Sequence, residues 1–134
     1  PAEGRRLWTE SSCQACHAAG GTGRSIGPDL SRIGAARTAR DLLESILFPD
    51  ATLVRDFETH LIETAGGEVH AGRLLREQAG TLTLIDAAGN EQSLPVASVV
   101  GRGISPRSLM PAGLELAMSE QQLLDLVAWL ASLR

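Results

Sequence analysis

The stretch Cys13-Gln14-Ala15-Cys16-His17 decides how the rest of the chain is interpreted. Two cysteines three positions apart can present both sulfurs to one edge of a flat porphyrin, and the adjacent imidazole can reach the iron at its centre. The spacing therefore predicts one haem c, attached covalently through Cys13 and Cys16, with His17 as the proximal iron ligand.

The same five residues also fit a thioredoxin-type redox pair or half of a zinc site, or they arise by chance. A zinc site needs four protein ligands, and the other candidates, His60 and His70, fall in a predicted β-segment. A thioredoxin motif follows the strand of a βαβ unit, and no strand is predicted before Cys13. Both observations favour haem attachment.

Composition sets the limits of the fold and of the location. The 134 residues suffice for one domain with a buried core, and 21% charged residues is an ordinary value for a globular protein. The sequence contains no apolar run that could span a bilayer and no recognisable signal peptide. Haem attachment to this motif takes place outside the cytoplasm. We therefore expect a periplasmic or otherwise exported protein, with an export signal or an exported domain upstream of Pro1.

The charge is unevenly distributed along the chain. All twelve basic residues are arginines; residues 1–40 carry six of them against three acids, and residues 41–110 carry five against ten acids. We interpret most of these charges as solvated surface, and no nucleic-acid-binding patch is indicated. Four arginines that follow the cysteine motif are candidates to pair with haem propionates: Arg24, Arg32, Arg37 and Arg40.

Helical patterns occupy both ends of the chain. A first helix is predicted from about Ala2 to Ser12, and Gly4 and Trp8 share one of its faces. Ser119-x-x-Gln122 is typical of a capping box, so a last helix is predicted from there to about Leu133. A glycine on one helix lets a large side chain of the other approach closely. We expect Gly4 and Trp8 to pack against Leu126 and Trp129.

A loop and a further helix are predicted between the motif and the middle of the chain. The segment Ala18–Gly23 is small and glycine-rich, which is typical of a loop. It leads into Ile26-Gly27-Pro28-Asp29-Leu30. Thr38-x-x-Asp41 and the apolar run that follows predict a helix that ends before Pro49.

From about residue 54 to residue 104 the hydrophobic period becomes that of strands. Phe57, Thr59 and Leu61 alternate with polar neighbours, including His60, so we expect His60 on a solvent-exposed face. Turns that contain glycine, and Pro95, separate further strands, which are predicted at Val69–Arg76, Thr81–Asp86, Glu91–Leu94 and Val99–Ile104. Five short strands indicate a small antiparallel β-unit, for which an SH3-like barrel is one arrangement.

Met110, in Ser108-Leu109-Met110-Pro111, is a candidate second iron ligand. A thioether suits an iron that alternates between two oxidation states, although most methionines are core residues. Its position after the cysteine motif and before the last helix favours ligation. Met118 lies at the start of that helix with no proline beside it, so we expect no ligand role for it.

Taken in order, these motifs resemble the class I cytochrome c fold. They are Gly4 with Trp8, the Cys13–His17 motif, Gly27-Pro28-x-Leu30, Met110-Pro111 and Leu126-x-x-Trp129. The resemblance implies a mainly α fold, 1–134 as a single domain with 54–104 inserted, and a mono-haem electron carrier with His17 and Met110 as axial ligands. It further implies that the Pro28 carbonyl accepts a hydrogen bond from His17 and that Leu30 packs on the haem.

The whole chain is similar to the Pirellula/Verrucomicrobium-type haem-binding domain. There the cysteine motif and Gly-Pro-Asp-Leu are followed by a Leu-Leu-Glu-Ser-Ile-Leu-x-Pro stretch, here Leu42 to Pro49, then by a β-rich segment and Ser-Leu-Met-Pro. Such domains commonly lie at the C-terminus of large exported proteins. The resemblance implies an electron-accepting module with a redox partner protein or a fused dehydrogenase domain.

Three functions remain open from the sequence. The first is electron transfer, the second is a gas-binding or sensor haem with a labile or absent distal ligand, and the third is an interaction module in which the haem is structural. A catalytic role of its own is disfavoured because no triad, carboxylate pair or phosphate loop accompanies the motif. A variant of the first function has His60 or His70 in place of Met110 at the iron.

Overall fold

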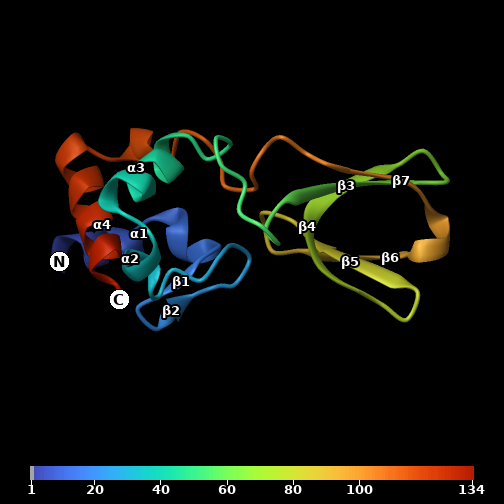
Figure 1. Ribbon diagram of the computed structural model, residues 1–134, viewed down its shortest axis with the longest axis horizontal. Helices are drawn as coiled ribbons and strands as arrows, with labels where there is room; N and C mark the ends of the chain where they lie inside the picture. Colours follow the sequence, from blue (N-terminus) through green and yellow to red (C-terminus); the bar gives the residue numbers. More distant parts are fainter. Residues whose placement is uncertain (1) are drawn as a thin grey trace. The chain divides into compact units, whose positions relative to one another are not determined.

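The computed structural model describes residues 2–134, and this part of the chain divides into two compact units (Figure 1). The first unit contains the chain up to Thr52 together with Pro111–Arg134. The second unit is Leu53–Met110, so it includes all of the predicted β-rich segment.

The first unit is built from helices and one small hairpin. Its α-helices are α1 (Ala2–Glu10), α2 (Ile33–Ala36), α3 (Ala39–Leu47) and α4 (Glu120–Ser132). Short 3-10 helices, η1 (Ser12–Ala15) and η3 (Leu114–Ala117), and a hairpin of β1 (Ala18–Ala19) and β2 (Thr22–Gly23) complete it. The helices α1, α3 and α4 were predicted. The hairpin falls in a segment that was expected to be a loop, and no element was predicted at the residues of α2.

The contact between α1 and α4 forms the centre of the first unit. A side chain on Gly4 would place its Cβ 2.2 Å from the carbonyl oxygen of Asp125 and 2.4 Å from the Cβ of Trp129, so the two backbones approach too closely for any residue but glycine. The rings of Trp8 and Trp129 lie 5.5 Å apart between centroids. The predicted pairing of Gly4 and Trp8 with Trp129 is therefore confirmed, and Leu126 is fully buried.

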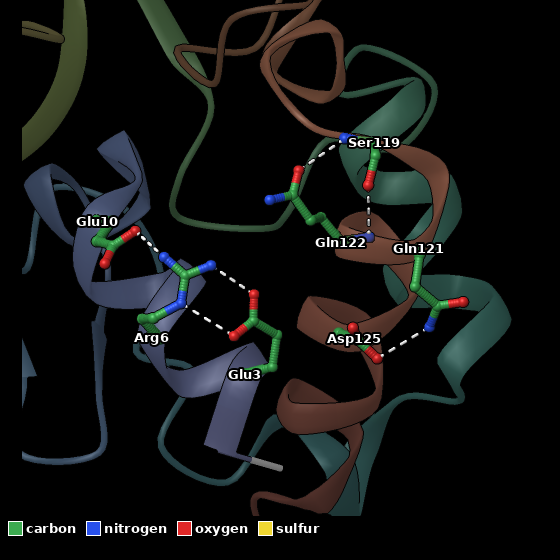
Figure 2. Close-up of polar contacts among 7 residues, drawn as sticks. All are labelled: Glu3, Arg6, Glu10, Ser119, Gln121, Gln122 and Asp125. Carbon is green, nitrogen blue, oxygen red and sulfur yellow. Dashed lines mark hydrogen bonds and ion pairs between the residues drawn. The ribbon is translucent and has the colours of Figure 1, made fainter.

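Side-chain caps define where the longer helices begin. Ser119 accepts a hydrogen bond from the backbone N–H of Gln122, and Gln122 accepts one from the backbone of Ser119, as Figure 2 shows. Thr38 and Asp41 form the same arrangement at the start of α3.

On the exposed side of α1, Arg6 pairs with Glu3 and Glu10 (Figure 2).

The second unit is a five-stranded antiparallel sheet. Its strands are β3 (Thr59–Thr64), β4 (Val69–Gln78), β5 (Thr81–Ile85), β6 (Glu91–Pro95) and β7 (Val99–Ile104), with η2 (Val96–Ser98) before the last strand. The strand order is β6-β5-β4-β3-β7, so the last strand returns to pair with the first. The predicted antiparallel sheet is confirmed. The pairing of β3 with β7 is a contact that strand patterns do not show.

The sheet has an apolar core of its own. Ile62, Leu82, Leu84 and Leu94 form a buried cluster, with Leu74, Val96 and Val99 packed against it. At the surface, Arg102 of β7 donates two hydrogen bonds to the carboxylate of Glu77 on β4, at 2.7 and 2.6 Å. These contacts join strands that lie far apart in the sequence.

The expected mainly α fold is wrong. The chain is 35% helical and 27% strand, because the helices of the first unit are short and the sheet fills nearly all of the second unit. Each strand of the five-stranded sheet was recognised in the sequence and the β1–β2 hairpin was not, so the share of the chain that the strands occupy was underestimated. Within residues 2–134, no helix combines the length and the apolar character needed to cross a membrane.

Candidate functional site

The two cysteines of the motif lie on a single tight turn. Ser11 precedes η1 and its hydroxyl accepts a hydrogen bond from the N–H of Cys13 at 3.4 Å. The N–H groups of Cys16 and His17 both donate to the carbonyl of Cys13, at 3.1 and 2.9 Å. Cys13 lies within η1 and Cys16 caps its C-terminal end, so both half-buried cysteines belong to one turn.

The imidazole of His17 is oriented by the segment that begins at Gly27. Its Nδ1 lies 2.7 Å from the carbonyl oxygen of Pro28. A carbonyl can only accept a hydrogen bond, so Nδ1 carries the proton and Nε2 presents its lone pair. Burial lowers the pKa of His17, and the Pro28 carbonyl opposes this in part. The neutral ring is the form that binds a metal.

Gly27 leaves room for this ring. A Cβ on Gly27 would lie 2.6 Å from Cε1 of His17 and 2.9 Å from its Nδ1. Two backbone hydrogen bonds hold the segment in place: Gly27 donates to Cys16 at 2.7 Å and Leu30 donates to Ala18 at 2.8 Å. A side chain at position 27 would therefore displace the imidazole.

Gly23 is a contact residue that sequence reasoning missed. Its φ is +101°, and a Cβ there would lie 2.0 Å from the carbonyl oxygen of His17. The hairpin of β1 and β2 thus folds back against the backbone of His17. The glycine-rich composition of residues 18–23 was the available signal, but it was interpreted as a loop.

The predicted site residues fall into two groups. Those of the first unit, Cys13, Cys16, His17, Gly27, Pro28 and Leu30, come together through the contacts above. Met110 is the last residue of the second unit, is half-buried, and donates its N–H to the hydroxyl of Ser108 at 3.1 Å. The role of Met110 as an iron ligand stays a prediction.

The arginine candidates differ in their surroundings. Arg24 lies near the motif, because its backbone N–H donates to Gln14 at 3.1 Å. Burial raises the pKa of the Cys16 thiol, and the charge of Arg24 lowers it. Arg40 instead pairs with Glu44 at 3.0 Å along α3. Arg24 is thus the candidate whose charge is placed beside the cysteine motif.

The two other histidines belong to the sheet. His60 pairs with Gly72 and Ile104, and it shares the face of β3 with the fully buried Ile62. His70 pairs with Ile62, keeps only 13% of its side chain exposed, and lies 3.4 Å from the carboxylate of Glu68. The expectation of a solvent-exposed face for His60 is wrong, because His60 lies on the same face of β3 as the buried Ile62 and Thr64.

The donor set fits a haem better than the alternatives. Within the described part of the chain, no three His, Cys, Asp or Glu side chains lie close enough to hold a metal ion by themselves. The element before the motif is the helix α1, which is not the strand that a thioredoxin motif requires. Two thiols on one turn, an imidazole with a presented Nε2 and a glycine against its ring match what a covalently held haem needs.

Comparison with known proteins agrees with this geometry. The sequence profile of the family described as Cytochrome c matches residues 1–83 of the chain. The matched part covers the whole cysteine motif, the segment that orients His17, α3 and the first strands of the sheet. A comparison with curated proteins finds no match.

Proposed function

Because the chain belongs to the cytochrome c family, we propose that it is an electron-transfer domain with one haem c attached through Cys13 and Cys16. His17 is the proximal ligand in this proposal, and Met110 is the distal one. The observation that carries it is the hydrogen bond between His17 Nδ1 and the Pro28 carbonyl at 2.7 Å, since this bond leaves Nε2 as the donor to iron.

Each residue of the site has a defined task. Cys13 and Cys16 provide the thioether sulfurs. Gly27 has no side chain and so leaves room for the imidazole of His17. The haem, when bound, supplies the one-electron couple of its iron. The hydrogen bond to Pro28 raises the basicity of His17 and fixes its orientation, so the ligand does not rearrange when the charge of the iron changes.

Met110 is the distal ligand in the proposal because of its chemistry and its sequence context. A thioether binds both oxidation states of haem iron and raises the reduction potential. The chain offers one other methionine, Met118, which follows η3 as its C-terminal cap residue. The gas-binding alternative requires that the bond from Met110 is labile or absent.

The domain then serves a larger redox system. Similarity to the Pirellula/Verrucomicrobium-type domain supports a module of an exported oxidoreductase that accepts electrons from a fused dehydrogenase domain or a separate redox protein. An exported, periplasmic location follows from where the cysteine motif acquires its haem. In this proposal the domain has no catalytic residues of its own.

Haem attachment is tested by extraction with acidified acetone. We expect the haem to stay with the protein, at one per chain by its pyridine complex, because thioether bonds survive conditions that break iron–ligand bonds. Haem in the organic phase would contradict covalent attachment.

Addition of carbon monoxide to the ferrous protein separates the two haem functions. Unchanged absorption under excess gas is expected for an iron with two strong axial ligands. Prompt, tight binding would favour the gas-binding function over electron transfer.

A further inference from the structure

Gly34 of α2 is buried against the end of α4. A Cβ on Gly34 would lie 2.1 Å from the carbonyl oxygen of Ala131 and 2.8 Å from that of Leu133. Its φ lies outside the left-handed region that favours glycine. The close approach of the two helices, and not the local backbone conformation, therefore requires glycine here.

A hydrogen bond fixes this approach. The N–H of Gly34 donates to the carbonyl of Leu133 at 2.8 Å. The last carbonyls of an α-helix have no partner within the helix, so α2 supplies one of the missing donors at the end of α4. The start of α2 is thus held both by contact and by hydrogen bonding.

The segment that orients His17 lies directly before this contact. Leu30 donates to Ala18, and Ile33 donates to Leu30 at 3.1 Å, which connects the segment to α2. Pro28 has no N–H and cannot secure its own position by donating. Its carbonyl is therefore placed by the anchors on either side, of which Gly34 is the one that contacts α4.

We propose that Gly34 is a positioning residue: the close contact of α2 with α4 holds the Pro28 carbonyl at hydrogen-bonding distance from His17 Nδ1. Ordinary van der Waals contact begins at 3.4 Å, so an alanine at position 34 would have to retreat by about 1.3 Å from the oxygen at 2.1 Å. A hydrogen bond of 2.7 Å is lost over a smaller displacement. The proposal rests on His17 as the iron ligand.

The test compares Gly34→Ala with Gly4→Ala in the haem-loaded ferric protein. Both substitutions force a Cβ into a backbone carbonyl of α4, at 2.1 Å and 2.2 Å, but Gly4 belongs to α1, which does not carry Pro28. Both are expected to lower the unfolding midpoint. The readout is deuterium exchange of the His17 Nδ1 proton, followed by NMR and corrected for global unfolding.

We expect Gly34→Ala to accelerate this exchange by about tenfold, the factor to which one lost hydrogen bond of about 1.4 kcal/mol corresponds. Gly4→Ala should leave the corrected rate unchanged. Equal corrected rates in the two variants would overturn the proposal, because Gly34 would then be a packing residue only.

A second variant covers the case in which Gly34→Ala does not fold. A chain ending at Ser132 lacks the Leu133 carbonyl and introduces no steric clash, so a smaller acceleration is expected. No acceleration would overturn the proposal. A wild-type Nδ1 signal that is not displaced by the paramagnetic iron would instead contradict His17 as the ligand.

Discussion

The two units of the chain are stabilised in different ways. In the sheet unit, side chains from several strands fill a common apolar core, and Ile62, Leu82 and Leu84 are 0–1% exposed. In the helical unit, four glycines permit contacts that a Cβ would block: Gly4, Gly23, Gly27 and Gly34. Buried apolar side chains hold the sheet together, whereas the helical unit also depends on close backbone contacts and, in the proposed function, on the haem that His17 ligates.

The largest effect is expected when the helical unit loses its covalently bound haem. In Cys13→Ala with Cys16→Ala, we expect loss of covalent haem and of most of the helical fold, because in the proposed function this unit closes around the haem. Amide hydrogen exchange should show the sheet still protected. Equal loss of protection in both units would show that the sheet depends on the helical unit.

Met110→Ala tests whether the sheet unit contributes a ligand to iron. The variant has no donor atom at this position, so we expect a lower reduction potential and stoichiometric binding of carbon monoxide. Met118→Ala is the matched control and should behave as wild type in both measurements. The reverse pattern would assign the ligand to Met118.

Leu84→Ala should destabilise the sheet unit alone, by about 2–5 kcal/mol, because Leu84 is 1% exposed and its removal leaves a cavity. Val69→Ala is a control on a side chain that is 62% exposed, and its effect should stay within about 0.5 kcal/mol. Urea unfolding followed by NMR signals of each unit measures both. A matching loss in the helical unit would mean that the two unfold together.

Ser119→Ala should destabilise the helical unit by about 1 kcal/mol, because the first turn of α4 loses its capping hydroxyl. Gln121→Ala removes only the exposed contact with Asp125 and should cost about 0.2–0.5 kcal/mol. Circular dichroism during thermal unfolding gives both values. A larger effect of Gln121→Ala would contradict the importance of the cap.

The smallest effect is expected from pH. Hydrogen bonds from Arg102 lower the pKa of Glu77 below its ordinary value of 4.5. The Glu77–Arg102 pair therefore contributes to the free energy of unfolding of the sheet above about pH 4.5. This contribution is lost as the pH falls through the lowered pKa of Glu77. Exposure keeps the effect small. Urea midpoints of wild type and Glu77→Gln should differ at neutral pH and converge in acid.

Local signals in the sequence predicted what local chemistry determines. The capping boxes at Thr38 and Ser119 located the starts of α3 and α4, and turn residues separated the strands. The strict spacing of Cys13, Cys16 and His17 placed these three residues on one turn, whereas the contact of Pro28 with His17, at 2.7 Å, was implied by the resemblance to class I cytochrome c. Each of these features depends on residues that are close in sequence or on a strict spacing.

Contacts between distant segments could not be predicted in the same way. The glycine at position 34 is required by the end of α4, about a hundred residues later, and nothing near it in the sequence shows this. Likewise, Thr59 and Ile62 lie on opposite faces of β3 and are both buried. Alternation therefore did not separate a wet face from a dry one, and His60 was misplaced.

The pairing of β3 with β7 has a consequence for how the chain can be rearranged. The N–H of Ser105 donates to the carbonyl of Thr59 at 2.8 Å, so the start of β3 and the end of β7 lie side by side. A module with adjacent ends can be removed or transplanted at a single loop of its host without stretching the host's backbone. Excision of residues 59–105 with a short linker, or grafting of those residues into an unrelated loop, is therefore geometrically open to protein engineering and to gene rearrangement.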